Sequence, residues 1–207
     1  MNRRHAITRF LISGFIGCWC VAFSVGAQTE SANEVITEPN QVDHAAYSER
    51  LSATGITPLV GSNIAYTLDQ VEVKLRRLVK DLAPEMTRED DNLLVRVSLE
   101  DAFTEEQLNP DFRSLLNAVA IVLQEHPAVF LQISAHADRM GSDRANRRRT
   151  EQHADAAAQY LGGRGIPLSH IMPVAYGESR PLIDKNTPAA RKRNRRIELL
   201  FLPVTAR

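Results

Sequence analysis

The residue types best suited to chemistry gather in the short segment 135–143, which contains a histidine, two aspartates, an arginine and a glycine. His136 and Asp138 could supply half of a metal site. The sequence offers no third or fourth ligand at helical or loop spacing, and it contains neither His-Glu-x-x-His nor Cys-x-x-Cys. We therefore predict that the protein holds no metal and needs no cofactor.

Covalent hydrolysis is not supported by the sequence either. A Gly-x-Ser-x-Gly elbow is absent, and the two cysteines, Cys18 and Cys20, lie in an apolar N-terminal stretch. The glycines at 162–165 follow a predicted helix instead of preceding one, so they end that helix and do not cradle a phosphate. These patterns predict a non-enzymatic protein.

Charge is distributed unevenly along the chain. Residues 28–137 carry 18 acidic and 8 basic residues, whereas residues 138–207 carry 7 acidic and 14 basic ones. The basic residues cluster at 139–149 and 191–196 without interleaved aromatic residues, and an export signal precedes them, so we expect no nucleic acid partner. Two interpretations remain open for these clusters: an anionic extracytoplasmic polymer or lipid head group, or a solvated charged face.

Strands and helices alternate around segment 135–143. Asn109 followed by Pro110 indicates the start of a helix, because proline favours the first helical position. The order β-α-β-α-β-(α)-β predicts an α/β (α+β sandwich) domain over residues 93–204, a mixed sheet with helices on one face. The predicted strands are 93–99, 129–133, 170–175 and 195–202, and the predicted helices are 110–125 and 145–161.

Upstream of this domain, apolar residues from Ile64 to Leu82 recur at steps of four and three. This pattern predicts an amphipathic helix that ends near Pro84 and is followed by a solvated loop, so that residues 63–92 form a helix and a loop. The helix could pack on the following domain, or it could form a short coiled coil that makes a homodimer or recruits an envelope protein. Residues 28–62 are polar and contain proline and glycine, and they predict a flexible linker.

The N-terminus has the layout of a secretory signal peptide over residues 1–27. Arg3, Arg4 and Arg9 precede the uncharged run 10–27, which ends in small residues. The same run is just long enough to be an uncleaved membrane anchor, and residues 15–18 loosely resemble a lipoprotein cleavage box. In each case we expect residues 30–207 to lie outside the cytoplasm, and after cleavage at 27 the chain contains no cysteine for a disulfide.

The segment from Val129 to Glu198 resembles the OmpA-like C-terminal domain, which OmpA, Pal and MotB proteins share. The family pattern Gly-His-Thr-Asp-x-x-Gly-x-x-x-x-Asn-x-x-Leu-Ser-x-x-Arg-Ala is followed in order and spacing, and the likeness extends over about residues 93–204. The residues that stand at the family's positions are Ala135, His136, Ala137, Asp138, Gly141, Asn146, Thr150 and Ala154, then Tyr160, Leu161, Gly165, Ile166, Tyr176, Gly177, Glu178, Ser179, Pro181, Thr187, Arg191 and 194–198; Ala135, Ala137 and Thr150 replace the pattern's Gly, Thr and Ser.

The resemblance implies non-covalent binding of Gram-negative peptidoglycan through diaminopimelate. In the family, the aspartate of the His-x-Asp turn takes the ligand's ammonium and an arginine takes its carboxylate. Asp138 fills the first role here, but His153 stands at the position of the arginine and Arg149 at that of a leucine. Arg149 precedes His153 by one helical turn on the same face, so it could substitute. The implied peptidoglycan-binding residues are Asp138, His153, Arg149, Asn146 and His136.

The sequence therefore predicts a periplasmic protein, associated with the outer membrane, that tethers an envelope component to peptidoglycan. An inner-membrane anchor at residues 10–27 is the alternative location. The alternative function is a degenerate OmpA-like domain that no longer binds peptidoglycan and acts as a protein-interaction module. If His153 contacts the ligand's carboxylate, affinity is expected to rise as the pH falls through about 6.5.

Overall fold

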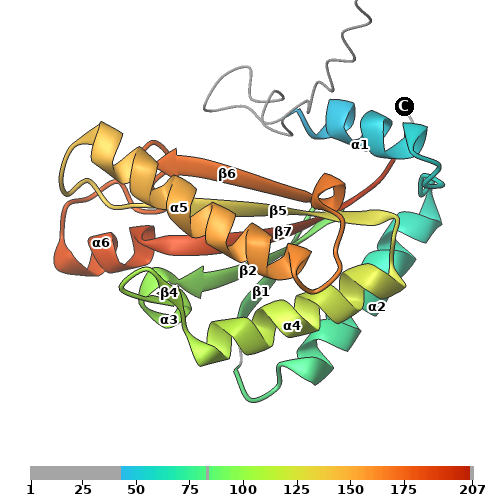
Figure 1. The fold of residues 1–207 in the computed structure, drawn as a ribbon, viewed down its shortest axis with the longest axis horizontal. Helices are drawn as coiled ribbons and strands as arrows, with labels where there is room; N and C mark the ends of the chain where they lie inside the picture. Colours follow the sequence, from blue (N-terminus) through green and yellow to red (C-terminus); the bar gives the residue numbers. More distant parts are fainter. Residues whose placement is uncertain (1–42, 83, 206–207) are drawn as a thin grey trace, which may run out of the picture. The chain divides into compact units, whose positions relative to one another are not determined.

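The computed structural model describes residues 43–82 and 84–205, and their centre is a five-stranded sheet (Figure 1). The strand order is β1-β2-β7-β5-β6. Only β5 and β6 run parallel among these neighbours, so the sheet is mixed, as the sequence predicts. The strands are β1 (Glu85–Glu89), β2 (Asn92–Ser98), β5 (Val129–His136), β6 (Ile171–Gly177) and β7 (Arg196–Pro203).

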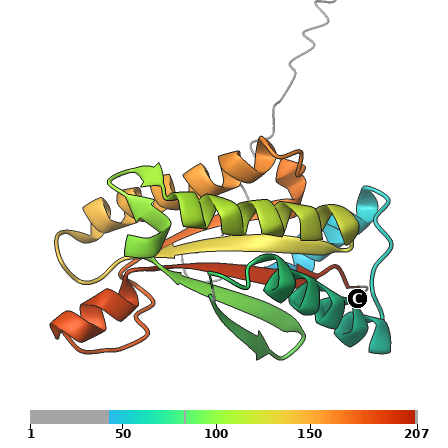
Figure 2. The ribbon, with the colours of Figure 1, turned by 90° about the horizontal axis from the view of Figure 1, so that it is seen from below.

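Two long helices cover one face of the sheet, α4 (Pro110–Glu125) and α5 (Asp143–Gly162), and Figure 2 shows both on the same side of it. Helix α4 begins at the predicted proline and ends at the predicted residue. The remaining elements are short: α3 (Leu99–Ala102), the hairpin β3 (Phe103–Thr104) and β4 (Gln107–Leu108), the 3-10 helix η1 (Leu168–His170) and α6 (Pro188–Asn194).

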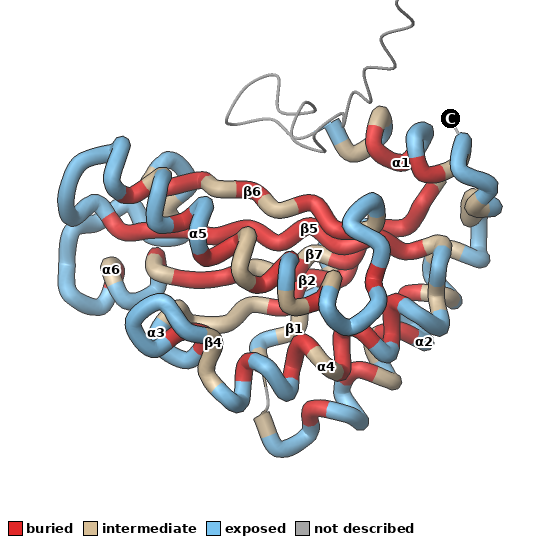
Figure 3. Tube along the Cα trace, in the orientation of Figure 1, coloured by how far each residue is buried: buried red, intermediate tan, exposed pale blue. Residues whose placement is uncertain are grey.

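Both faces of strand β5, which lies between β7 and β6, are buried, and Figure 3 shows them as a continuous run of buried residues. Leu131 and Ile133 belong to the core under the helices, whereas Phe130 belongs to a smaller core on the opposite face. This arrangement follows from the two-residue period of a strand, which sends successive side chains to opposite faces. Two different surfaces therefore flank β5.

The predicted linker 28–62 is wrong over its described part. Helix α1 (His44–Ala53) lies there and packs on the face of the sheet opposite α4 and α5. The ring of Tyr47 contacts that of Phe130 at a centroid distance of 4.9 Å, and the Ser48 hydroxyl donates a hydrogen bond to the Thr205 carbonyl. The helix was missed because its polar residues outnumber its few buried ones. Within the predicted domain 93–204 the long helices α4 and α5 do lie on one face, and the helix on the other face, α1, comes from the segment before it.

The predicted solvated loop 85–92 is a strand followed by a tight turn. Strand β1 pairs antiparallel with β2 and is an edge of the sheet. Its side chains alternate between exposed and half-buried, so polar residues fill most of it. An edge strand buries little surface, and its sequence therefore resembles that of a loop.

Helix α2 (Ser62–Leu78) confirms the predicted amphipathic helix, although it ends one turn before Leu82. Leu68, Val71 and Leu75 of its apolar seam are fully buried in the core that α2 shares with α4 and the sheet. The seam is filled by this domain and is not free to pair with a second copy. The coiled-coil interpretation of helix 64–82 is therefore wrong, and the packed helix is the arrangement observed.

The predicted signal segment 1–27 and the linker residues 28–42 lie outside the described residues. Within 43–82 and 84–205, no helix has the length and apolar character required to cross a membrane.

Candidate functional site

The segment that follows β5 is held against the end of its parallel neighbour β6. The Ala137 amide donates a hydrogen bond to the Gly177 carbonyl at 2.7 Å, and the Gly177 amide donates to the Thr150 hydroxyl of α5 at 3.1 Å. Gly177 has a φ of 53°, and a Cβ there would lie 3.3 Å from the Arg147 amide nitrogen. A Cβ would crowd the backbone of α5, and the positive φ is strained for other residues, so both features favour glycine here.

Asn146 of α5 holds the segment that follows β5 in place through its side-chain amide. It is 1% exposed, and its side-chain amide donates hydrogen bonds to the Asp138 carbonyl and to the Glu178 carboxylate at 3.1 and 2.7 Å. Both donors of this amide are used within the domain. Asn146 therefore acts by positioning Asp138.

The Asp138 carboxylate lies at the mouth of the site with partners on both oxygens. Its Oδ1 accepts a hydrogen bond from the Met140 amide at 3.0 Å, and its Oδ2 lies 2.7 Å from Nη1 of Arg195. The side chain is 9% exposed, so one edge still reaches solvent. A carboxylate has about four lone-pair positions, and these two contacts leave room for a further donor.

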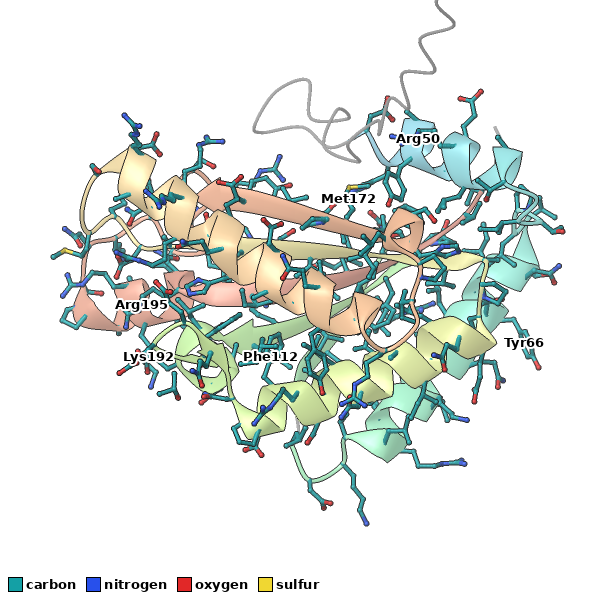
Figure 4. All side chains as sticks on the ribbon, in the orientation of Figure 1. Arg50, Tyr66, Phe112, Met172, Lys192 and Arg195 are labelled. Atoms are coloured by element: carbon teal, nitrogen blue, oxygen red, sulfur yellow. The ribbon has the colours of Figure 1, made fainter. Side chains whose placement is uncertain are left out.

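Arg195 is a residue of the site that the sequence prediction did not include. Its Nη2 lies 2.7 Å from Oε1 of Glu100 in α3, and Lys192 approaches the other oxygen of Glu100 at 3.4 Å. Figure 4 shows Arg195 and Lys192 on the same side of the molecule, next to α3. The hydrogen bonds that the Arg195 guanidinium donates to Glu100 and Asp138 raise its pKa further, so it remains a cation.

His153 lies in the interior, 4% exposed, and its ring packs on that of Phe103 at a centroid distance of 4.4 Å. Among the described residues its Nδ1 has no hydrogen-bond partner. Burial lowers the pKa of the imidazole below its ordinary value, and the charge of Arg149 lowers it further against a smaller opposite effect of Glu106. The side chain is therefore a neutral imidazole at neutral pH.

His153 and Arg149 line one cleft of about 690 Å³ between α5, α3 and the β3–β4 hairpin. Glu100 also lines this cleft and binds Arg195, so the cleft adjoins the Asp138–Arg195 pair. Of the five predicted site residues, Asn146, Arg149 and His153 lie along the first half of α5, and Asp138 lies just before its first residue.

His136 does not belong to this group, contrary to the prediction. Its side chain lies on the opposite face of the sheet, where its ring stacks on Tyr176 at 5.0 Å and its Nε2 lies 3.2 Å from Oε2 of Glu198. The strand period explains the error, because His136 follows Gln132 and Ser134 on one face of β5. Within the described part of the chain, no group of three His, Cys, Asp or Glu side chains could hold a metal ion.

Comparison with known protein families identifies the domain that carries this site. A family model described as "OmpA family" matches residues 102–195. These residues form an OmpA family domain. The match contains Asp138, Asn146, Arg149 and His153, and it ends at Arg195.

Individual proteins resemble the OmpA family domain and its flanks. The probable lipoprotein YiaD of Escherichia coli is 28% identical over 147 residues, which is 70% of this chain and 67% of that protein. The peptidoglycan-binding protein ArfA of Mycobacterium tuberculosis is 34% identical over 93 residues, 45% of this chain and 28% of ArfA. The chain thus spans about two thirds of the first relative and under a third of the second.

Solved structures show the same fold. The structure of a MotB-like protein from Desulfovibrio vulgaris superposes with a TM-score of 0.59 over 76% of this chain and 99% of that one, at 16% identity. The mixed sheet with α4 and α5 on one face is therefore a fold that the MotB-like protein shares.

Proposed function

We propose that the OmpA family domain binds peptidoglycan non-covalently and tethers a component of the cell envelope to it, without catalysing a reaction. The observation that carries the proposal is the partly exposed Asp138 carboxylate, whose partner Arg195 also binds Glu100 at the cleft that Arg149 lines. A fixed anion beside a planar cation suits the zwitterionic end of an amino acid such as diaminopimelate. The name of the relative ArfA supports the same ligand class.

In this proposal the Asp138 carboxylate accepts a hydrogen bond from the ligand's ammonium, at the lone-pair positions that Arg195 and the Met140 amide leave open. The ligand's carboxylate then goes to the cleft, where Arg149 supplies a guanidinium and His153 a neutral imidazole. Arg149 is exposed and therefore free to turn toward the ligand, whereas His153 is fixed by Phe103. Asn146 holds Asp138 in place from the interior.

We further propose that the domain works in the periplasm in association with the outer membrane. The relative YiaD is named a probable lipoprotein, and the relative YfiB of Pseudomonas aeruginosa an outer-membrane lipoprotein. A signal segment at 1–27 agrees with this location, and an inner-membrane anchor at 10–27 remains the alternative.

A second function is favoured by one specific observation. His153 gives a neutral donor or acceptor where the family has a guanidinium, and loss of a charge-assisted hydrogen bond costs about 1.5–3 kcal/mol, or roughly ten- to a hundredfold in affinity. If Arg149 does not compensate, the domain is a periplasmic protein-interaction module that no longer binds the cell wall.

Co-sedimentation distinguishes the two functions. The purified chain is mixed with peptidoglycan that contains diaminopimelate, and in parallel with peptidoglycan that contains lysine at the same position. We expect saturable binding to the first and weaker binding to the second, because lysine lacks the second carboxylate. No binding to either would reject the tether and favour the interaction module.

The pH dependence of binding tests the role of His153. Because burial and Arg149 lower the pKa of its imidazole, the ring gains its charge below pH 6.5 and not at it. Affinity is therefore expected to stay level from pH 8 to about 6.5 and to rise below that value. In His153→Gln, which keeps a neutral polar group, the rise should disappear. A profile that is flat down to pH 5.5 in the parent protein would contradict a contact between His153 and the carboxylate.

The same lowered pKa predicts the opposite trend for stability. The unfolded chain binds a proton at His153 more readily than the folded one, so folding stability is complete above pH 6.5 and decreases as the pH falls toward the folded-state pKa. Binding assays below pH 6.5 therefore need a parallel measurement of the folded fraction.

A further inference from the structure

Three exposed segments meet at one end of the sheet: the loop 139–142 that follows β5, the loop 180–187 that follows β6, and helix α6 (Figure 1). An ion pair joins the two loops, since Nη1 of Arg139 lies 2.6 Å from Oδ1 of Asp184. We call the exposed side chains of these two loops and of α6, together with the first residues of α5, the α6 surface.

Helix α6 holds the loop 180–187 by its backbone. The Ile183 amide donates a hydrogen bond to Oδ1 of Asn194, and the Ile183 carbonyl accepts one from Nδ2 of the same side chain, both at 3.0 Å. Nη1 of Arg191 donates to the Asn186 carbonyl at 3.1 Å. Because the contacts use the backbone of the loop, its side chains from 182 to 187 remain exposed.

Large apolar side chains are exposed on the α6 surface. Met140 is 56% exposed, Leu182 39% and Ile183 36%. A single exposed apolar residue needs no explanation, but these three lie on two loops that an ion pair joins. The domain does not bury these side chains, so only a partner can remove them from water.

Basic residues accompany these apolar side chains. The segments 139–144 and 180–194 contain seven basic and two acidic residues, and one of the two acids, Asp184, is paired with Arg139. Helix α6 alone contributes three of the basic residues, Arg191, Lys192 and Arg193. Arginine and lysine lay their apolar stems along a surface and extend the charged group beyond it. The α6 surface therefore combines exposed apolar side chains with an excess of positive charge.

We propose that the α6 surface binds an anionic phospholipid bilayer. Met140, Leu182 and Ile183 enter the boundary between head groups and acyl chains, and the basic side chains of α6 bind the phosphates. Such binding strengthens with the apolar area that is buried and with the attraction to anionic lipids, and it needs no matching groove. An acidic polypeptide would pair with the cations but has no apolar phase for the three apolar side chains. The proposal does not depend on peptidoglycan binding at Asp138.

Vesicle co-flotation tests the proposal with the chain from residue 28. This chain keeps the whole compact unit 31–207 and omits the apolar run 10–27, which could enter a bilayer by itself. The probes are vesicles of phosphatidylglycerol and phosphatidylcholine in equal amounts, vesicles of phosphatidylcholine alone, and soluble polyglutamate. We expect saturable binding to the anionic vesicles and roughly tenfold weaker binding to the neutral ones. Added salt should weaken the binding, because it screens exposed charges.

Two pairs of variants locate the contact. Arg193→Gln removes an exposed cation of α6 and is expected to weaken binding roughly fivefold. Leu182→Ser removes an exposed apolar side chain and is expected to weaken it about three- to tenfold. The matched controls lie on α2, at the other end of the sheet (Figures 1 and 2): Arg77→Gln removes an exposed cation, and Val73→Ser an apolar side chain that is 59% exposed. Both controls should bind like the parent.

Asp138→Asn separates lipid binding from peptidoglycan binding. The Asp138 carboxylate accepts a hydrogen bond from the Met140 amide, so it lies beside the α6 surface. Removing its negative charge should leave binding to anionic vesicles at least as tight as in the parent, whereas binding to peptidoglycan is expected to fall. A failure of one function is therefore distinguishable from a failure of the other.

Four results would overturn the proposal. The first is the absence of saturable binding to anionic vesicles, and the second is equal binding to neutral ones. The third is equal weakening by a variant of the α6 surface and its control on α2, which would place the contact elsewhere. The fourth is binding of polyglutamate as tight as that of vesicles, with neither changed by Leu182→Ser, which would assign the surface to an acidic polypeptide.

Discussion

Replacing Asp138 with asparagine is expected to weaken binding to diaminopimelate-type peptidoglycan about tenfold to a hundredfold. The substitution keeps the size of the side chain and leaves an oxygen for the Met140 amide, but it removes the negative charge that the ligand's ammonium requires. It also turns an amide donor toward Arg195, where the carboxylate oxygen now lies 2.7 Å from Nη1. Co-sedimentation with purified sacculi measures the change.

Asp184→Asn is the matched control for this variant. Asp184 also pairs with an arginine, Arg139 at 2.6 Å, but its side chain is 77% exposed and lies outside the cleft. It should bind peptidoglycan like the parent. A melting curve checks that Asp138→Asn remains folded, since Arg195 keeps its contact with Glu100. Equal binding by parent and Asp138→Asn would reject Asp138 as the anchoring anion.

The parts of the fold that the sequence predicts are those with strong local signals. Pro110 and the apolar residues that recur along one face predict helix α4 to the residue. The alternating β-branched residues of 93–99 predict β2, and the alternation of Ile197, Leu199 and Phe201 predicts β7. Edge strand β1 and helix α1 were missed, because elements that bury little surface keep a polar sequence, and only their tertiary contacts reveal them.

In the site, too, the residues that share one sequence motif can be predicted, whereas a residue brought in by strand pairing cannot. Asp138 and His153 share one motif, so their positions follow from spacing alone. Arg195 lies 57 residues from Asp138, and its contact depends on the pairing of β5 with β7. That register sets His136 opposite Arg196 and so brings Arg195 beside Asp138. The basic cluster at 191–196 was visible in the sequence, but nothing local indicates which of its residues meets the aspartate.

The misplacement of His136 has a physical cause that the sequence did contain. In a strand, residues two apart share a face, so His136 had to lie with Gln132 and Ser134 and away from Ile133 and Ala135. The family motif implies a ligand contact and the predicted strand ends at 133, whereas β5 continues to His136 and so brings this residue under the strand period. The structure places His136 on the face that the two-residue strand period indicates. The polar side chains on that face, Gln132, Ser134 and His136, line a cavity of about 270 Å³.

Truncating Leu75 to alanine is expected to lower the free energy of unfolding by about 2–5 kcal/mol. Leu75 is fully buried in the core that α2 shares with α4 and the sheet, and its loss leaves a cavity that close-packed neighbours cannot fill. Urea unfolding followed by circular dichroism measures the change. The control is Leu78→Ala on the same helix, where the side chain is 41% exposed and the expected loss is below about 1 kcal/mol.

Leu75→Ala also distinguishes an α2 that packs within its own domain from an α2 that holds two copies together. If the apolar seam of α2 packs only within its own chain, Leu75→Ala lowers the urea midpoint of unfolding. The midpoint then does not depend on protein concentration, in the parent or in the variant. If the seam instead held two copies together, the parent's midpoint would rise with concentration, because association adds stability by mass action. A concentration-dependent midpoint that Leu75→Ala abolishes would therefore contradict the packing of Leu68, Val71 and Leu75 within one chain.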